Sequence, residues 1–391
     1  MTEKLYWEYP YAHTFVAEIV DIRENGLVLD RTLFHPESGG QSCDLGMLKV
    51  NEMELDVTRV SREDDGSILH HVTGVHGCLE VQDEVKGLIN WDRRYLLMKA
   101  HTAQHVFSSI MLEEHDRNTT SVSITPGGFT ARVNKHVDGS MIEQIIESVN
   151  HVLFTQHPVK NVVLSREEAI KKYGDIIRGL MSDEDPVRVI QVEDIEVTCC
   201  GGTHVKDTSE IGPIYLEGVK KGVKFTFLVG DDAISALARA NTTVFELANH
   251  VNQDHARVLD TITGRLDKHE QLQDDLITVA QELLGMLATR PQRAINGFGV
   301  SILEIPLEKK VIAPAFSKFP WNSILVVLGD GGRFIVFSSA EDMPASGICN
   351  AFLETHGGKG GGNQKVSQGK MEQEPSPRVL FDTIESLLEN A

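Results

Sequence analysis

The feature that most constrains the fold of this chain is a pair of short motifs rich in histidine and cysteine, which lie far apart in the sequence. His101 and His105 stand four residues apart, so that both imidazole rings would lie on one face of a helix. Cys200 and His204 have the same spacing, and the two glycines between them allow a tight turn. Three imidazoles and one thiolate form a tetrahedral zinc set. We therefore expect the fold to bring these four side chains together around one zinc ion.

Neither half of this set is specific by itself, because a histidine pair on a helix more often lies at the surface or in the core. Together, in a chain with 5 cysteines among 391 residues, the two halves favour a metal site. The gap of about 95 residues between His105 and Cys200 does not fit a small zinc finger. Thr102 stands where a zinc protease carries its glutamate base, which argues against that class. A closed zinc site that only stabilises the fold is the structural alternative.

The hydrophobic pattern predicts an α+β protein with four regions. Residues 1–90 contain short β-rich segments separated by turns, typical of a small β-barrel. Residues 91–230 combine two amphipathic helices, at 92–114 and 141–155, with later strands, and predict an α+β core.

The second half of the chain predicts a helical arm and a separate α/β domain. Over 231–292, apolar residues recur every three or four positions, which indicates two helices with a turn at Gly264. A hairpin or coiled-coil arm and an ordinary helix pair packed on a domain fit this pattern equally well. Within 293–391, the segments 324–328 and 334–337 flank a glycine turn and predict a hairpin.

Composition limits the compartment and the partners. A run of about 18 apolar residues is absent, as is a basic and apolar N-terminus, so we expect neither a membrane span nor a signal peptide. The odd number of cysteines argues against a disulfide framework and predicts a cytoplasmic protein. The formal net charge of -20 argues against nucleic acid as a partner. Binding is local, however, and acid-free windows such as 355–370 keep a polyanion partner open.

A series of motifs resembles the AlaX family, the free-standing alanyl-tRNA editing proteins related to the editing part of alanyl-tRNA synthetase. In chain order, they are Thr32-x-Phe34-x-Pro36-x-Ser38-Gly39-Gly40-Gln41, Asp44-x-Gly46, Trp91-Asp92-Arg93-Arg94, the first metal motif, Ser165-Arg166-Glu167-Glu168-Ala169 and the second metal motif. The segment 357–362 resembles the DHH-associated domain that ends alanyl-tRNA synthetases and points to the long form of AlaX. The chain begins directly at the editing barrel, so we expect an enzyme that acts in trans.

The resemblance implies a deacylase for tRNA(Ala) mischarged with serine, and with glycine as a second candidate, that spares Ala-tRNA(Ala). It implies one zinc ion per chain, held by His101, His105, Cys200 and His204, which would polarise the ester carbonyl or activate a water molecule. Four protein ligands leave no open position on a tetrahedral ion. We therefore expect His105 or His204 to be displaced when substrate binds.

The resemblance also assigns the recognition of serine to Thr32, which by itself would be a plain strand residue. A pocket that hydrogen-bonds the seryl hydroxyl leaves its own polar groups unpaired when alanine enters. Gln41, which follows Gly39 and Gly40, either orients water or the ester or simply ends a barrel turn. Asp92 and Arg93 either support the site or cap the following helix, and capping is the favoured role for Asp92.

The C-terminal glycine-rich segment is expected to be a loop that contacts tRNA, because exposed N–H groups suit phosphate. The candidate contacts are Lys359, Gly360, Gly361, Gly362, Lys365 and Lys370. A flexible linker is the alternative. A homodimer through the helical arm and the C-terminal domain is a further expectation.

Two rival functions stay open. One is a non-catalytic tRNA-binding protein with a structural zinc ion. The other is an editing factor for another tRNA, such as threonyl-tRNA, which would share the metal motifs but would not be expected to carry this barrel motif and C-terminal domain. A phosphoesterase is disfavoured because the Asp-His-His motif that normally accompanies such a C-terminal domain is absent.

Overall fold

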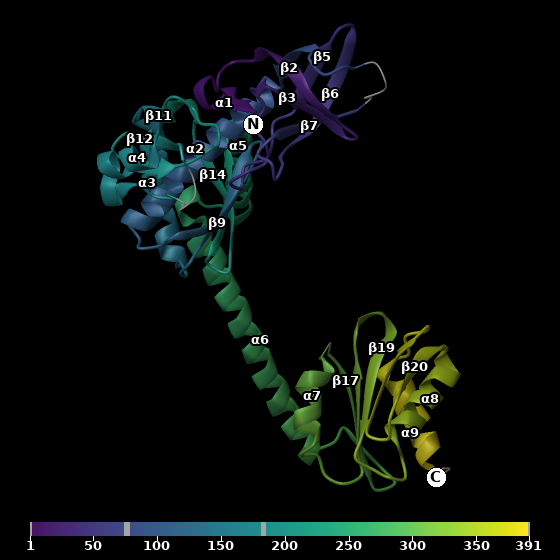
Figure 1. Ribbon diagram of the computed structural model, residues 1–391. Coiled ribbons are helices and arrows are strands. Elements are labelled where there is room, and N and C mark those ends of the chain that lie inside the picture. The colour runs from purple at the N-terminus through teal and green to yellow at the C-terminus, as the bar shows by residue number, and fades with distance from the viewer. Residues whose placement is uncertain (1, 74–78, 181–184, 306, 390–391) are drawn as a thin grey trace. The chain divides into compact units, whose positions relative to one another are not determined.

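The computed structural model describes residues 2–73, 79–180, 185–305 and 307–389 (Figure 1). The chain divides into two compact units, Met1–Glu246 and Leu247–Ala391, and each is described by itself. The architecture is α+β, as predicted, and the first unit contains a small closed barrel of six strands. No helix in the described ranges combines the length and the apolar character needed to span a membrane.

The barrel closes in the order β2-β3-β7-β6-β5-β8. Its strands are β2 (Thr14–Arg23), β3 (Gly26–Leu29), β5 (Gly46–Val50), β6 (Met53–Arg62), β7 (Ile68–Val72) and β8 (Glu84–Ile89). Buried and exposed residues alternate along β2 and β8, which places Phe15, Val85 and Ile89 in the core. A short helix, α1 (Leu5–Glu8), follows β1 (Glu3–Lys4), which pairs in parallel with β4 (Arg31–Thr32).

The long helix α2 (Trp91–Glu113) follows the barrel and carries the histidine pair. Its N-cap is Asn90, whose side chain accepts a hydrogen bond from the N–H of Arg93. The capping role expected for Asp92 is therefore wrong. Asp92 lies in the first turn, where a negative charge suits the positive end of the helix dipole.

Two sheets complete the first unit. The strands of the larger sheet are, in spatial order, β14 (Ile214–Lys220), β15 (Lys224–Val229), β10 (Gly128–Val133) and β9 (Thr119–Thr125). The helices α2 and α3 (Gly139–Phe154) pack on it around Phe107, which contacts the rings of Phe129 and Phe227. The smaller sheet has β11 (Val159–Leu164), β12 (Val187–Val192) and β13 (Glu196–Cys199), and Ala169 of α4 (Arg166–Tyr173) packs against it.

The predicted helical region forms α5 (Gly230–Val251) and α6 (Val258–Thr289). The turn expected at Gly264 is wrong, because this glycine lies inside α6 and the helices are separated at 252–257. A single glycine lowers helix stability by only about 1 kcal/mol, which the rest of the helix can offset.

The second unit contains a six-stranded sheet between two helical layers (Figure 1). Its strands are, in order, β16 (Arg293–Ile295), β17 (Phe298–Glu304), β18 (Ser323–Leu328), β19 (Arg333–Ser338), β21 (Val366–Met371) and β20 (Gly358–Gly362). Residues of α8 (Ala345–His356) and α9 (Pro377–Glu389) cover one face, and α7 (Lys309–Phe316) with the end of α6 covers the other. The predicted hairpin is confirmed by the antiparallel β18-β19 pair. The glycine-rich segment expected to be a loop is instead the edge strand β20, because its backbone pairs with β21.

Candidate metal centre

The structure brings the four predicted metal ligands together. The ligand atoms of His101, His105, Cys200 and His204 all lie within 4.8 Å of one another. The first two come from the middle of α2, and the other two from the turn that follows β13. Cys200 Sγ lies 3.5 Å from Nε2 of His101 and 3.4 Å from Nε2 of His204. This cluster can hold a metal ion, and its donor set suits zinc.

Each histidine of the cluster has its second ring nitrogen bound by another side chain. The pairs are His101 Nδ1 with Gln41 Oε1 at 2.7 Å, His105 Nδ1 with Glu196 Oε2 at 2.6 Å, and His204 Nδ1 with Thr102 Oγ1 at 3.1 Å. The hydroxyl of Thr102 donates to the carbonyl of Met98, so it accepts from His204. Since Nδ1 donates in all three pairs, Nε2 of each ring is left to bind a metal ion. Such partners fix the tautomer and orientation of metal-binding histidines.

The environment keeps these rings in the form that binds metal. Burial lowers the pKa of His101 and His204, so both imidazoles are neutral at neutral pH. The carboxylate of Glu196, which holds His105, also forms an ion pair with Arg178. Sequence reasoning missed Glu196, Thr102 and Arg178 as parts of this site. The position of Glu196, four residues before Cys200, is the one local signal that pointed to it.

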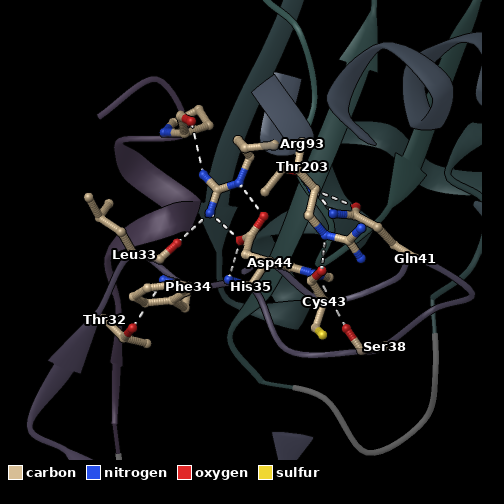
Figure 2. Close-up of polar contacts among 12 residues, drawn as sticks. Thr32, Leu33, Phe34, His35, Ser38, Gln41, Cys43, Asp44, Arg93 and Thr203 are labelled. Atoms are coloured by element: carbon tan, nitrogen blue, oxygen red, sulfur yellow. Dashed lines mark hydrogen bonds and ion pairs between the residues drawn. The ribbon is translucent and has the colours of Figure 1, made fainter. Parts of the chain in front are cut away.

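Gln41 connects the barrel to the metal cluster. Its buried side chain accepts from Nδ1 of His101. It also accepts from the backbone N–H of Thr203 at 3.0 Å and donates to the Thr203 hydroxyl at 2.9 Å (Figure 2). The turn of the barrel that the sequence suggested is also present, since Ser38 and Gln41 form a backbone bridge. These contacts support a role in holding His101 and Thr203 in place.

The two glycines before Gln41 allow its backbone to approach β9. Gly39 and Gly40 have φ values of 59° and 82°, in the left-handed region that favours glycine. A Cβ atom on Gly40 would lie 2.6 Å from the carbonyl oxygen of Val122. Gln41 itself bridges in parallel to Ile124 of β9.

Thr32 lies in the core of the barrel, fully buried. Its hydroxyl accepts from the N–H of Phe34 at 3.0 Å (Figure 2). The same hydroxyl lies 2.8 Å from Nε2 of His70. Nδ1 of His70 is 3.1 Å from the carbonyl of Leu27 and therefore carries the ring proton. Because burial lowers the pKa of His70 to about 4, the ring is neutral and Thr32 donates to Nε2. In the part of the chain that the structure describes, Thr32 forms no hydrogen bond with any of the four predicted metal ligands.

Five of the six expected tRNA contacts lie on the last two strands of the second unit, β20 and β21, and Lys365 lies in the connection between these strands. Lys359, Gly360, Gly361 and Lys370 line a cavity of about 680 Å³, whereas Gly362 and Lys365 lie outside its lining. Arg333 of β19, which sequence reasoning missed, lines the same cavity. Its position directly before the predicted strand 334–337 was the available signal.

Two families of known proteins match parts of this chain. The family described as "Threonyl and Alanyl tRNA synthetase second additional domain" matches residues 187–224, which include Cys200 and His204. The family of class II (A) tRNA synthetases matches residues 5–93, which include the barrel. The segments that carry Gln41 and the Cys200–His204 pair therefore resemble parts of these synthetases, whereas His101 and His105 lie between the two matched ranges.

The chain is 28% identical to "Alanyl-tRNA editing protein AlaX-L" from Pyrococcus horikoshii, over 98% of this chain and 97% of that protein. It is also 28% identical to an alanine–tRNA ligase from Sulfurisphaera tokodaii, of which it spans 44%. The resemblance to the long form of AlaX is thereby confirmed. The C-Ala domain of Aquifex aeolicus alanyl-tRNA synthetase matches 23% of this chain at 16% identity, with a TM-score of 0.20, which is too low to support an argument.

Proposed function

We propose that this protein is a zinc-dependent hydrolase that removes serine from mischarged tRNA(Ala) in trans, with glycine as a second substrate, and spares Ala-tRNA(Ala). The observation that carries the proposal is the buried cluster of three histidines and one cysteine in a chain similar along its length to an alanyl-tRNA editing protein. One zinc ion bound there would polarise the ester carbonyl or lower the pKa of a water molecule.

Substrate needs a vacant position at the metal centre, and the contacts favour His204 as the residue displaced. His105 is held by the Glu196 carboxylate at 2.6 Å, and Arg178 fixes that carboxylate in turn. His204 is held by the neutral hydroxyl of Thr102 at 3.1 Å. Because hydrogen bonds to charged groups are stronger, His204 is the easier of the two to move.

Turnover separates this proposal from a tRNA-binding protein with a structural metal ion. Purified full-length protein is mixed with a large excess of Ser-tRNA(Ala), and free serine is counted per protein molecule. The proposal requires many serines per chain. Tight tRNA binding with no more than one serine released per chain would favour the binding protein.

Thr32→Val should relax the choice between seryl and alanyl esters. The hydroxyl of Thr32 donates to His70, so it offers its remaining lone pair to a substrate hydroxyl. Losing one such hydrogen bond should lower the ratio of kcat/KM for Ser-tRNA(Ala) over Ala-tRNA(Ala) by about tenfold. Thr32→Ser keeps the hydroxyl and is the control, whose ratio should stay near that of the unaltered protein. An unchanged ratio in Thr32→Val would rule out this role.

We propose that the cavity of the second unit binds tRNA phosphates. Lys370 of β21 lies directly opposite Arg333 of β19 on one side and Lys359 of β20 on the other. The three cations therefore form a row across these strands. Like charges opposite each other on a sheet are unfavourable, and an anion would relieve this repulsion. Two acidic residues, Glu308 and Asp330, also line the cavity. Glu308 forms an ion pair with Lys310 at 2.8 Å.

Lys370→Glu should therefore weaken tRNA binding and reduce the slope of log Kd against log salt by about one or more. Lys318→Glu makes the same change of charge at an exposed position outside the cavity lining and is the control. Filter-binding titrations at several salt concentrations measure both. Equal effects of the two variants would show that only the overall charge matters.

We further propose that this cytoplasmic enzyme has four functional parts. They are the barrel at 1–90, the metal-binding core at 91–230, the arm at 231–292 and the tRNA-binding domain at 293–391. A homodimer through the arm is supported by exposed apolar residues on α6. These residues are Leu272, Leu276, Val279 and Met286. Sedimentation of the full chain should then give twice 43.3 kDa, and the mass of one chain would exclude the dimer.

A further inference from the structure

Arg188 is a buried cation beside the metal cluster to which the proposed function gives no role. It belongs to β12, and only 3% of it is exposed. Burial lowers its pKa to about 10, so the guanidinium is charged at neutral pH. In the described part of the chain it forms no ion pair with a carboxylate, unlike the buried Arg94, which pairs with Asp44. A buried charge without a carboxylate is unfavourable unless other groups compensate it.

The compensating groups belong to the turn that carries the cysteine ligand. Nη1 of Arg188 donates to the carbonyl of Cys200 at 3.0 Å and to the carbonyl of Gly202 at 2.7 Å. The carbonyl of Arg188 itself accepts from the N–H of Cys200 at 3.0 Å. One residue therefore binds both ends of the 200–202 turn. Within the turn, the N–H of Gly202 lies 3.4 Å from Cys200 Sγ, so the shape of the turn sets the position of the sulfur atom.

The other three ligands are held by different residues. His101, His105 and His204 are fixed by the side chains of Gln41, Glu196 and Thr102, as described above. None of these three residues bonds to the backbone of Cys200 in the described structure. Arg188 thus holds the thiolate ligand in place, as the three side chains above hold the imidazoles. The hydrogen bond from Nη1 to the carbonyl of Cys200 also places the positive charge beside the residue that carries the thiolate.

We propose that Arg188 is a positioning residue of the metal centre, which holds the 200–202 turn so that Cys200 Sγ points at the ion and whose charge offsets that of the thiolate. The inference rests on the proposed metal site and adds a residue that acts through Cys200 alone. Arg188→Met removes both the charge and the two donated hydrogen bonds while keeping a similar length. Residues of this kind typically change metal affinity by about 10- to 100-fold.

The test is a cycle of four full-length proteins: unaltered, Arg188→Met, Cys200→Ala and the double variant. Zinc affinity is measured for each by competition with a chromophoric chelator. Cobalt(II) is then used to follow the thiolate-to-metal absorption band. Arg188→Met should weaken zinc binding by about 10- to 100-fold and reduce the cobalt–thiolate band. In the Cys200→Ala background, where three histidines still bind the ion, the same substitution should change affinity by less than about threefold.

Three results would overturn the inference. One is an unchanged zinc affinity and cobalt band in Arg188→Met. Another is an equal loss of affinity in both backgrounds, which would mean that Arg188 supports the fold in general. Failure of the unaltered protein to bind zinc or cobalt would instead remove the proposed metal centre itself. Should Arg188→Met not fold, Arg188→Lys replaces it in the cycle, since it keeps the charge but loses the two-carbonyl geometry of the guanidinium.

Discussion

His101→Ala should lower kcat/KM for Ser-tRNA(Ala) by about a thousandfold. A metal ion in a hydrolase supplies several kcal/mol of transition-state stabilisation, and about 1.4 kcal/mol corresponds to a factor of ten in rate. His101 contributes Nε2 to the cluster, 3.5 Å from Cys200 Sγ, and its Nδ1 is the group that Gln41 binds. Its loss therefore removes one ligand and the connection between the barrel and the cluster.

His115→Ala is the matched control for this substitution. His115 is also buried and follows closely after α2, but it is not a member of the cluster. Metal content per chain and kcat/KM are measured for both variants. The control should retain its metal and most of its activity. If His101→Ala were metal-free and as active as the unaltered protein, hydrolysis would not depend on this centre.

Asp44→Ala should reduce the unfolding free energy of the first unit by about 3 to 5 kcal/mol. Removing one partner of a buried ion pair leaves the other charge uncompensated in the interior. Both side chains of the Asp44–Arg94 pair are fully buried. Arg94 Nη1 also donates to the carbonyl of Pro10 at 3.0 Å, and Asp44 accepts from the N–H of His35 at 2.6 Å (Figure 2). The pair thus connects the start of α2 to the segment between β4 and β5, which also contains Gln41.

Glu54→Ala provides the control, because the Lys49–Glu54 pair is exposed and such pairs contribute only about 0 to 1 kcal/mol. Urea unfolding is followed by tryptophan fluorescence in a Trp321→Phe background. Trp7 and Trp91 then report on the first unit alone. A loss below about 1 kcal/mol in Asp44→Ala would show that Arg94 finds another partner or water.

Each half of the metal set could be predicted because its geometry is local. His101 and His105 share a helix face, and Cys200 and His204 share a turn, so spacing indicates that each pair lies together. That the two halves meet was inferred from the chemistry of the four donors, because about 95 residues separate them. Their partners could not be predicted in this way. Gln41 is 60 residues from His101, and Glu196 is 91 residues from His105. Such contacts depend on how the barrel, α2 and β13 pack together, which no single segment specifies.

The errors in the secondary structure have a similar origin. The glycines of β20 have no side chains to pack, so their pattern favours a loop, and only the pairing with β21 makes them a strand. Asn90 and Asp92 are both residue types that cap helices, and which of them does so depends on where the backbone turns helical. Arg188 was missed because one arginine in an apolar strand gives no sign of what its side chain binds.

The central claim is metal-dependent hydrolysis of a mischarged ester with the correct ester spared. The most direct measurement is the loss of label from Ser-tRNA(Ala) and Ala-tRNA(Ala) by the purified full-length protein, before and after treatment with a chelator and again after zinc is restored. We expect rapid loss of serine, retention of alanine, arrest by the chelator and recovery with zinc. Equal rates for the two esters, or serine release that continues after the metal has been removed, would contradict this claim.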